Sequence, residues 1–298
     1  MTGFLTRTLA RVRMFANEPA VNAKFSNDAL IDLITSMYME VFGELVRLSA
    51  HPITVTYDIV PQSDQMEYDL PMLMGSVELI ECVNSNGDRL WIIEPRSRLS
   101  LTGEGFRIEN RTLIFTGTQP PVGHTFRIHY IPVACPCLHE GAITPSTDIA
   151  TVSNRHVVTL SATPTLGTLD TRQNSYAGCT LKLLNAPEQS HEISSFDSVT
   201  RKATLRTKLD PVPTGVSVAY EIAPPINEVM DMAVAVGVAK TVVAMEGNTT
   251  AMSTLTQLYN EKMREIRLFA ANMDSYKGGR LSPSAYMNRR IPWGVLIR

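Results

Sequence analysis

The chain has 298 residues and a net charge of −2, with 44% hydrophobic and 19% charged residues, an ordinary balance for a globular protein of two or three modest domains. Its four cysteines lack the dense, regular spacing of a secreted disulfide scaffold, so reduced thiols are expected. The longest apolar run, Met232 to Ala239, is far shorter than the roughly 20 residues that span a bilayer. No transmembrane helix and no membrane partner are therefore expected.

Charge is distributed unevenly along the chain. Residues 1–24 carry a net +3 and residues 275–298 a net +5, which leaves −10 for residues 25–274. Residues 1–25 are interpreted as a basic N-terminal arm. An organelle transit peptide is the alternative, because the first sixteen residues hold three arginines and no acid. Basic ends therefore flank an acidic body.

A helix is predicted over residues 26–50, where apolar residues recur at three- and four-residue steps and Ser26 or Asn27 can cap the first turn. Two stretches near the C-terminus, Asn227 to Met245 and Thr249 to Tyr276, repeat this pattern and predict a helical hairpin.

One-sided helices cannot bury their apolar stripes alone, so the N-terminal helix is predicted to close against the C-terminal hairpin. The resulting helical bundle would comprise residues 26–50 and 226–276. The side chains predicted to pack in it are those of the apolar stripes: Leu30, Leu33, Ile34, Met37, Val41, Leu45, Met232, Val236, Val243, Leu255, Leu258, Ile266 and Phe269.

Between these helices the apolar period changes to two, which is typical of strands. Short strands separated by turn-forming residues predict a small β-barrel or sandwich over residues 51–143. A linker at Thr144 to Thr147 leads to a second small β unit, which extends over residues 144–225. The predicted fold class is α+β, with a helical bundle as the base and two small antiparallel β units inserted in it.

Residues 277–298 predict an extended basic tail, since glycines and prolines discourage a continuous helix there. The tail combines arginine with aromatic side chains, the types that dominate protein interfaces. The candidate docking residues are Arg280, Tyr286, Arg289, Arg290 and Trp293. A frayed, solvated terminus is the alternative interpretation.

The sharpest cluster of potential ligands is Cys135, Cys137 and His139, to which His129 could add a fourth. A Cys-x-Cys step is strained at a tetrahedral site and no second spaced pair follows, so buried thiols are the preferred interpretation and zinc binding is left open. The sequence contains no P-loop, no Gly-x-Ser-x-Gly and no complete zinc-protease motif. The chain is therefore not expected to be an enzyme, and no cofactor is assigned to it.

Three segments together resemble the head-to-tail adaptor proteins of tailed bacteriophages. The first is the predicted helix Ser26 to Ser49 with the later step Gln65-Met66-Glu67-Tyr68-Asp69-Leu70-Pro71. The others are the strand unit Gly178 to Ile222 and the helical hairpin Glu228 to Tyr276 with its basic tail. The resemblance covers most of the chain and rests on structural patterns, and the chain departs from the family in carrying the extra β unit.

The resemblance implies a structural virion protein at the head–tail junction, made in the bacterial host cytoplasm. Its subunits would form a ring, commonly of twelve, whose helical part faces the portal protein. The C-terminal tail would dock on the portal, and the β part would meet nozzle or fibre proteins of the tail. Double-stranded DNA would pass without sequence-specific binding, because an acidic channel wall repels phosphate.

Two alternatives to the adaptor are kept. One is another tail component, such as a nozzle or fibre-attachment subunit, because β units are common in all of these proteins. The other is a virion enzyme that acts on cell-wall polymer and uses the Gly178 to Ile222 unit to bind carbohydrate.

Overall fold

The computed structural model describes residues 3–19, 23–48, 54–71, 73–84, 88–93, 105–116, 123–132, 136–152, 155–184, 188–223 and 228–275. The helices in these ranges are α1 (Phe4–Ala16), α2 (Asn27–Leu48), α3 (Pro145–Asp148), α4 (Glu228–Met245) and α5 (Thr249–Ser275). The strands are β1 (Val55–Ile59), β2 (Glu67–Asp69), β3 (Met74–Val83), β4 (Arg89–Ile93), β5 (Gly105–Glu109), β6 (Thr112–Thr116), β7 (Thr125–Pro132), β8 (His139–Ile143), β9 (Ile149–Val152), β10 (Arg155–Thr159), β11 (Leu166–Gly167), β12 (Thr180–Leu183), β13 (Gln189–Asp197), β14 (Lys202–Leu205) and β15 (Val218–Ala223).

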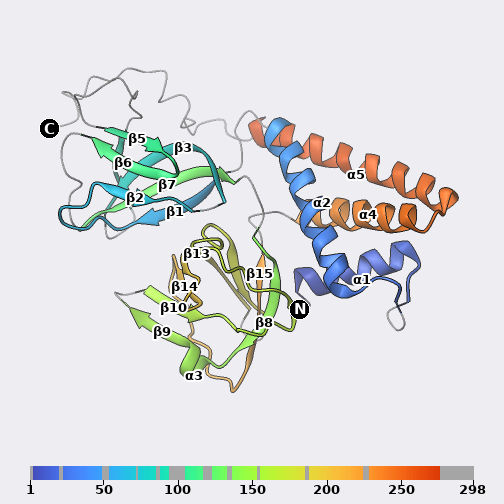
Figure 1. Ribbon diagram of the computed structural model, residues 1–298, viewed down its shortest axis with the longest axis horizontal. Coiled ribbons are helices and arrows are strands. Elements are labelled where there is room, and N and C mark those ends of the chain that lie inside the picture. The colour runs from blue at the N-terminus through green and yellow to red at the C-terminus, as the bar shows by residue number, and fades with distance from the viewer. Residues whose placement is uncertain are drawn as a thin grey trace.

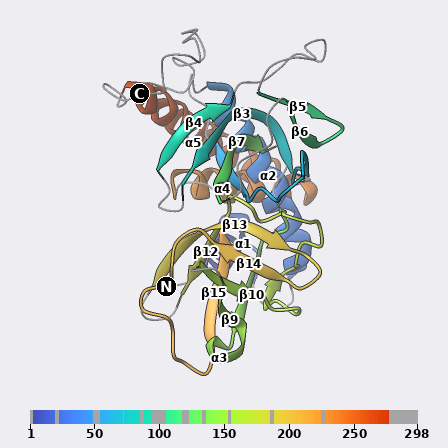
Figure 2. The same cartoon turned by 90° about the vertical axis from the view of Figure 1, so that its left-hand side faces the viewer.

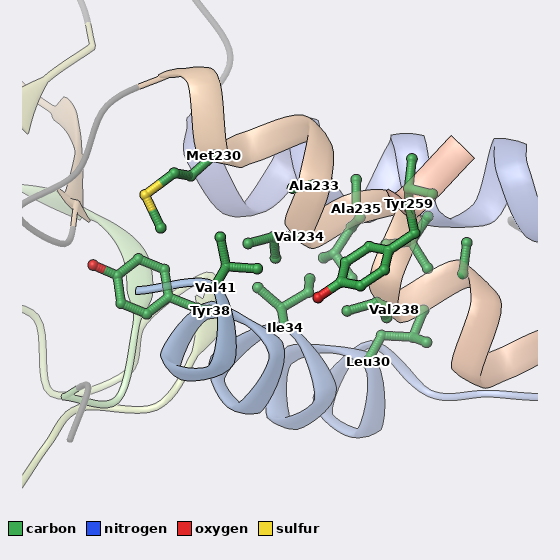
Figure 3. Close-up of a cluster of buried hydrophobic side chains, with 14 of the residues drawn as sticks. Leu30, Ile34, Tyr38, Val41, Met230, Ala233, Val234, Ala235, Val238 and Tyr259 are labelled. Carbon is green, nitrogen blue, oxygen red and sulfur yellow. The ribbon is translucent and has the colours of Figure 1, made fainter. Parts of the chain in front are cut away.

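Helices α1, α2, α4 and α5 lie together on one side of the molecule (Figure 1). Helix α4 is apolar on every face, and it is contacted by each of the other three. Figure 3 shows Leu30 and Ile34 of α2 beside Val234 and Val238 of α4, and all four side chains are fully buried. Burying a side chain of this size contributes about 1.5–3 kcal/mol. None of the described helices is both long and apolar enough to cross a membrane.

A glycine sets the close approach of α2 to α4. A Cβ atom at Gly237 of α4 would lie 2.5 Å from the sulfur of Met37 in α2. Because glycine has no side chain, the thioether can lie directly against the α4 backbone. The two helices therefore pack at a distance that a larger residue at position 237 would increase.

Strands β1 to β7 form two antiparallel sheets, one in the order β1-β7-β3-β4 and one in the order β2-β6-β5. Leu113 and Phe115 of the three-stranded sheet share a hydrophobic core with Phe126 and Ile128 of the four-stranded sheet. The rings of Phe115 and Phe126 lie with their centroids 4.7 Å apart. We call these two sheets the β1–β7 unit, because they enclose a core of their own.

Strands β8 to β15 form one antiparallel sheet in the order β11-β8-β15-β12-β13-β14-β10-β9. Its core is separate from the other two, with Tyr176, Phe196 and Tyr220 among its largest fully buried side chains. We call it the eight-stranded unit. In Figure 2 it lies below the β1–β7 unit, and the helices lie behind both.

The predicted fold class, a helical bundle as the base with two small β units inserted in it, is wrong. The described chain is a mixed α/β structure, rich in strands, with three antiparallel sheets of which one has eight strands. The helices form one side of the molecule rather than its core, and each of the two β units has its own buried cluster. Helical periodicity is visible in consecutive residues, whereas pairing between distant strands is not, so the prediction placed too much weight on the helices.

Two segments differ from their predicted conformation. Helix α1 occupies most of the predicted N-terminal arm, and its buried residues Leu5, Leu9 and Val12 face α4 and its neighbours. The predicted linker Thr144 to Thr147 holds most of the short helix α3.

Strand β8, from the predicted first β segment, pairs with β15 of the second. The chain is therefore more interleaved than a series of consecutive domains.

Candidate functional site

The first turn of α1 rests on two carboxylates from neighbouring strands. Thr6 donates to Glu140 of β8, from its amide at 2.8 Å and from its hydroxyl at 2.6 Å, while the amide of Phe4 donates to Glu221 of β15. Glu140 and Glu221 pair across the sheet, so two like charges lie side by side. The free amides and the positive end of the helix dipole stabilise both, and Lys182 lies 3.4 Å from Glu221.

A second ion pair fastens α1 to α4. Arg7 Nη2 lies 2.5 Å from Asp231 Oδ2, and only 10% of the Asp231 side chain is exposed. Burial raises the pKa of Asp231 above its usual range, and Arg7 acts against this shift. Two arginines of the predicted arm, Arg7 and Arg13, thus pair within the fold, since Arg13 lies 2.8 Å from Glu18.

A row of alternating charges crosses one face of the four-stranded sheet. Asp58 of β1 lies opposite Arg127 of β7, which lies opposite Glu81 of β3. Arg127 Nε donates to Asp58 at 3.1 Å, while Glu81 accepts from Arg89 at 2.6 Å and contacts His129 at 3.0 Å. Burial acts to raise the pKa of Glu81, but the bonds with His129 and Arg89 lower it to about 2. The Glu81 carboxylate is therefore ionised at neutral pH.

Asp58 also joins the β1–β7 unit to the eight-stranded unit. Arg206 Nη2 donates to Asp58 Oδ1 at 3.2 Å, and Arg155 Nη1 lies 3.9 Å from Oδ2. The Asp58 side chain is only 1% exposed. Arg206 also lies 3.4 Å from Glu192, which accepts a hydrogen bond from the Thr56 hydroxyl. Charged groups from both units therefore meet at one buried junction.

Neutral hydrogen bonds complete this junction. The Asn174 side chain donates to the Tyr57 hydroxyl at 3.0 Å, and the Tyr130 hydroxyl donates to the carbonyl of Ala177 at 3.1 Å. Each bond connects a strand of the β1–β7 unit to the segment that precedes β12. The junction thus combines these polar bonds with an apolar contact, because Ala177 also belongs to the hydrophobic core of the β1–β7 unit.

His139 lies fully buried at the start of β8 and contacts the hydroxyl of Tyr176. This hydroxyl accepts from the Asp170 amide at 2.6 Å and donates to the Cys137 carbonyl at 3.0 Å. One lone pair remains, so the network assigns the proton of the imidazole to Nδ1, which lies 3.0 Å from the hydroxyl. Burial lowers the pKa of His139 to about 4. The ring is therefore neutral at pH 7.

The described thiols are held in unreactive forms. Burial raises the pKa of Cys82 to about 11 and that of Cys179 to about 12, and it also raises the pKa of Cys137. A thiol that stays protonated at neutral pH is a weak nucleophile and a poor metal ligand. The thiols lie in or beside sheets and act there as small packing groups.

The candidate zinc ligands are not brought together within the described residues. Cys135 lies outside them, His129 contacts Glu81 in the four-stranded sheet, and His139 contacts Tyr176 beside the eight-stranded sheet. In the part of the chain that the structure describes, no three or more His, Cys, Asp or Glu residues are grouped so as to hold a metal ion.

The tail residues predicted to dock on the portal, Arg280, Tyr286, Arg289, Arg290 and Trp293, lie outside the described residues. The residues predicted to pack between helices divide into three sets. The buried ones are Leu30, Ile34, Val41, Leu45, Val236, Val243, Leu255 and Ile266. Leu33, Met37, Met232 and Leu258 are half-buried, and the side chain of Phe269 is not described.

The buried carboxylates Asp58, Glu81, Glu140 and Glu221 were missed by reasoning from the sequence. Asp58 stands with Thr56 at the polar positions of an alternating strand, a pattern that usually indicates a solvent-exposed charge. Its partners come from distant segments, so the sequence did not indicate that this carboxylate is buried.

No protein-family model matches the chain, and a comparison with curated proteins gives no match either. The function therefore has to be inferred from the contacts between its units.

Proposed function

We propose that the chain is a structural subunit of a tailed-bacteriophage virion, a head-to-tail adaptor that forms a ring between the portal and the tail and surrounds the passing DNA. The observation that carries this proposal is that buried charged side chains connect the separate parts of the chain. They fasten α1 to the eight-stranded unit, α1 to α4, and one β unit to the other. Such contacts hold together parts of the chain that each have their own hydrophobic core, which suits a load-bearing ring subunit.

The chemistry of the buried groups supports a structural role. His139 is neutral, and its Nδ1 is used in the bond to Tyr176. Glu81 and Asp58 are held by arginines on the same sheet face. Each of these groups therefore has a structural partner.

The sequence resemblance and the charge distribution point the same way. The net −10 of residues 25–274 suits the wall of a channel that DNA passes without binding, since like charge repels phosphate. The basic residues of the tail at 277–298 suit docking on a separate protein. In this proposal the helices face the portal and the two β units face the tail proteins.

The decisive experiment adds the purified full chain to phage heads that carry the portal but lack a tail. Electron microscopy should show a ring of subunits, commonly twelve in the family, on the portal. A variant that lacks residues 278–298 should keep the circular dichroism spectrum of the full chain and no longer bind the heads. Normal joining by this variant would refute the docking role of the tail, and binding elsewhere on the particle would identify a nozzle or fibre-attachment subunit.

A second measurement tests when the ring forms. The isolated chain should sediment as a monomer or a weakly associated species, because the ring is expected to assemble on its portal partner. A stable ring in the absence of the portal would refute this order of assembly. Release of soluble fragments from cell-wall polymer, lost on substitution of one carboxylate, would favour the enzyme instead.

A further inference from the structure

The junction between the two β units differs in character from the rest of the interior. The β1–β7 unit has its own hydrophobic core, and so does the eight-stranded unit. Across their contact lie hydrogen bonds and ion pairs, as between Asp58 and Arg206 or Thr56 and Glu192, together with a small apolar contact in which Ala177 joins the core of the β1–β7 unit. Separation of the two units would therefore break these polar contacts and uncover Ala177, while the rest of each core could stay closed.

Asp58 is the centre of this junction. Its own unit supplies Arg127 at 3.1 Å, while the eight-stranded unit supplies Arg206 at 3.2 Å and Arg155 at 3.9 Å. The Asp58 side chain is 1% exposed, and those of the three arginines are 16–33% exposed. Glu192 also lies near Arg206, and Glu81 lies near Arg127. Asp58 is nevertheless the carboxylate that contacts arginines of both units, and its removal would increase the repulsion between these guanidinium groups.

A small apolar cavity lies at another part of the junction, between β1, β7 and the segment before β12. It is lined by Tyr38 and Phe42 of α2, by Val55 and Tyr130 of the β1–β7 unit, and by Ser175 of the segment before β12, among others. The hydroxyl of Ser175 is buried and has no hydrogen-bond partner among the described residues. Contacts that leave a void and an unsatisfied hydroxyl are easier to exchange than a close-packed core.

We propose that Asp58 is an ionic latch, which holds the β1–β7 unit against the eight-stranded unit and, when its charge is removed, releases the β1–β7 unit as a folded body. Asp58 is the carboxylate at which arginines of both units meet. The hydrogen bonds of Tyr57 and Tyr130 and the close approach of Gly178 to Val55 lie at the same junction and carry no charge. This inference does not depend on the proposed adaptor role.

The test is hydrogen–deuterium exchange of the full chain, with Asp58→Asn compared with wild type. Amides of residues 174–179 and those of the edge strand β1 that do not pair with β7 lie at the junction, and they should exchange at least tenfold faster in the variant. Amides of β3, in the core of the β1–β7 unit, and of β12 should keep their wild-type rates. The matched control is Asp69→Asn, because Asp69 is an exposed aspartate of the same unit, and it should change none of these rates.

A locked variant separates release from local unfolding. Thr56 and Glu192 are in side-chain contact across the junction, so Thr56→Cys with Glu192→Cys can be joined by a short bis-maleimide cross-linker. In the Asp58→Asn background, cross-linking of this pair should restore the slow exchange of the junction, which should stay fast in the same variant without the cross-linker. If Asp58→Asn does not fold, Arg155→Gln is the substitute, since it removes only the longest of the three contacts and should give a smaller acceleration in the same peptides.

Two results would overturn the latch. Unchanged exchange at the junction would show that Asp58 does not hold the units together. Faster exchange throughout β3 as well as at the junction would show that the unit unfolds rather than detaches.

Discussion

Acidification should destabilise this protein through one buried imidazole, that of His139. The ring is fully buried and neutral, and its pKa is lowered by burial from 6.5 to about 4. The unfolded chain binds a proton near pH 6.5, while the folded chain resists it until about pH 4. The stability that depends on the neutral ring is therefore complete above pH 6.5 and is lost as the pH falls toward 4.

The magnitude follows from the two pKa values. Linkage gives a loss of about 2 kcal/mol of unfolding free energy between pH 7 and pH 5, and of about 3 kcal/mol by pH 4. Glu81 also loses stabilisation in acid, but its window lies between pH 4.5 and about 2, so it contributes only about 0.2 kcal/mol at pH 5. Burial lowers the pKa of His191 as well, which adds a loss of the same sign. A comparison with a variant at position 139 removes these shared contributions.

The assay is urea unfolding of wild type and His139→Gln at pH 7 and pH 5. Glutamine can still bond the hydroxyl of Tyr176 but does not titrate, so the variant should lose about 2 kcal/mol less than wild type over this range. His124→Gln, at a half-buried ring beside Trp91, is the matched control and should follow wild type. Equal losses in wild type and His139→Gln would refute the assignment of a neutral, buried imidazole.

Three further substitutions test other parts of the fold. Glu81→Gln should cost about 3 kcal/mol at pH 7, and the difference from wild type should shrink below pH 4.5 as Glu81 itself is protonated, which urea unfolding at several pH values can follow. Gly178→Ala should lower the melting temperature and cost about 1–3 kcal/mol of unfolding free energy, because φ is +80° at this position and the new Cβ would lie 2.6 Å from Cβ of Val55. An unchanged melting temperature would contradict this backbone conformation. Leu45→Ala should cost about 2–5 kcal/mol in denaturant unfolding, whereas Met252→Ala, at an exposed position of α5, should stay within about 0.5 kcal/mol.

The sequence predicted the spans of individual helices more accurately than it predicted what packs around each helix. The predicted helices over residues 26–50, Asn227 to Met245 and Thr249 to Tyr276 overlap α2, α4 and α5. Periodicity predicts such spans because it depends on side chains a few residues apart. Periodicity also predicted a single apolar stripe for α4, whereas residues 233–239 are all buried. Which faces of a helix have neighbours depends on the fold and cannot be read from the segment alone.

Helix α1 shows why the first segment was misread. Leu5, Leu9 and Val12 already stand at helical steps, but the arginines between them indicated a solvated arm. Arg7 pairs with Asp231, which is 224 residues further along the chain. Buried ion pairs of this kind cannot be read from a single sequence, since either partner alone looks like a surface charge.

The pairing of strands was the other feature that could not be predicted from the sequence. The alternation of apolar residues predicted many strands, and strands occur in both β segments. The order β8-β15-β12 joins strands that are far apart in the chain, so one sheet takes up segments that consecutive reading divides between two units. Asp58 and Arg206 meet for the same reason, and the junction between the units could not be predicted from either strand.

The attachment of α1 has a consequence for how the protein is made. Its first turn bonds to Glu140 and Glu221, and Arg7 bonds to Asp231, so its partners follow 134 to 224 residues later. At translation rates of about 5–20 residues per second, α1 leaves the ribosome roughly 10–45 s before the last of them. During that interval the buried face of α1 has no native partner to cover it. Helix α1 can therefore reach its native position only after β8, β15 and the start of α4 have been synthesised.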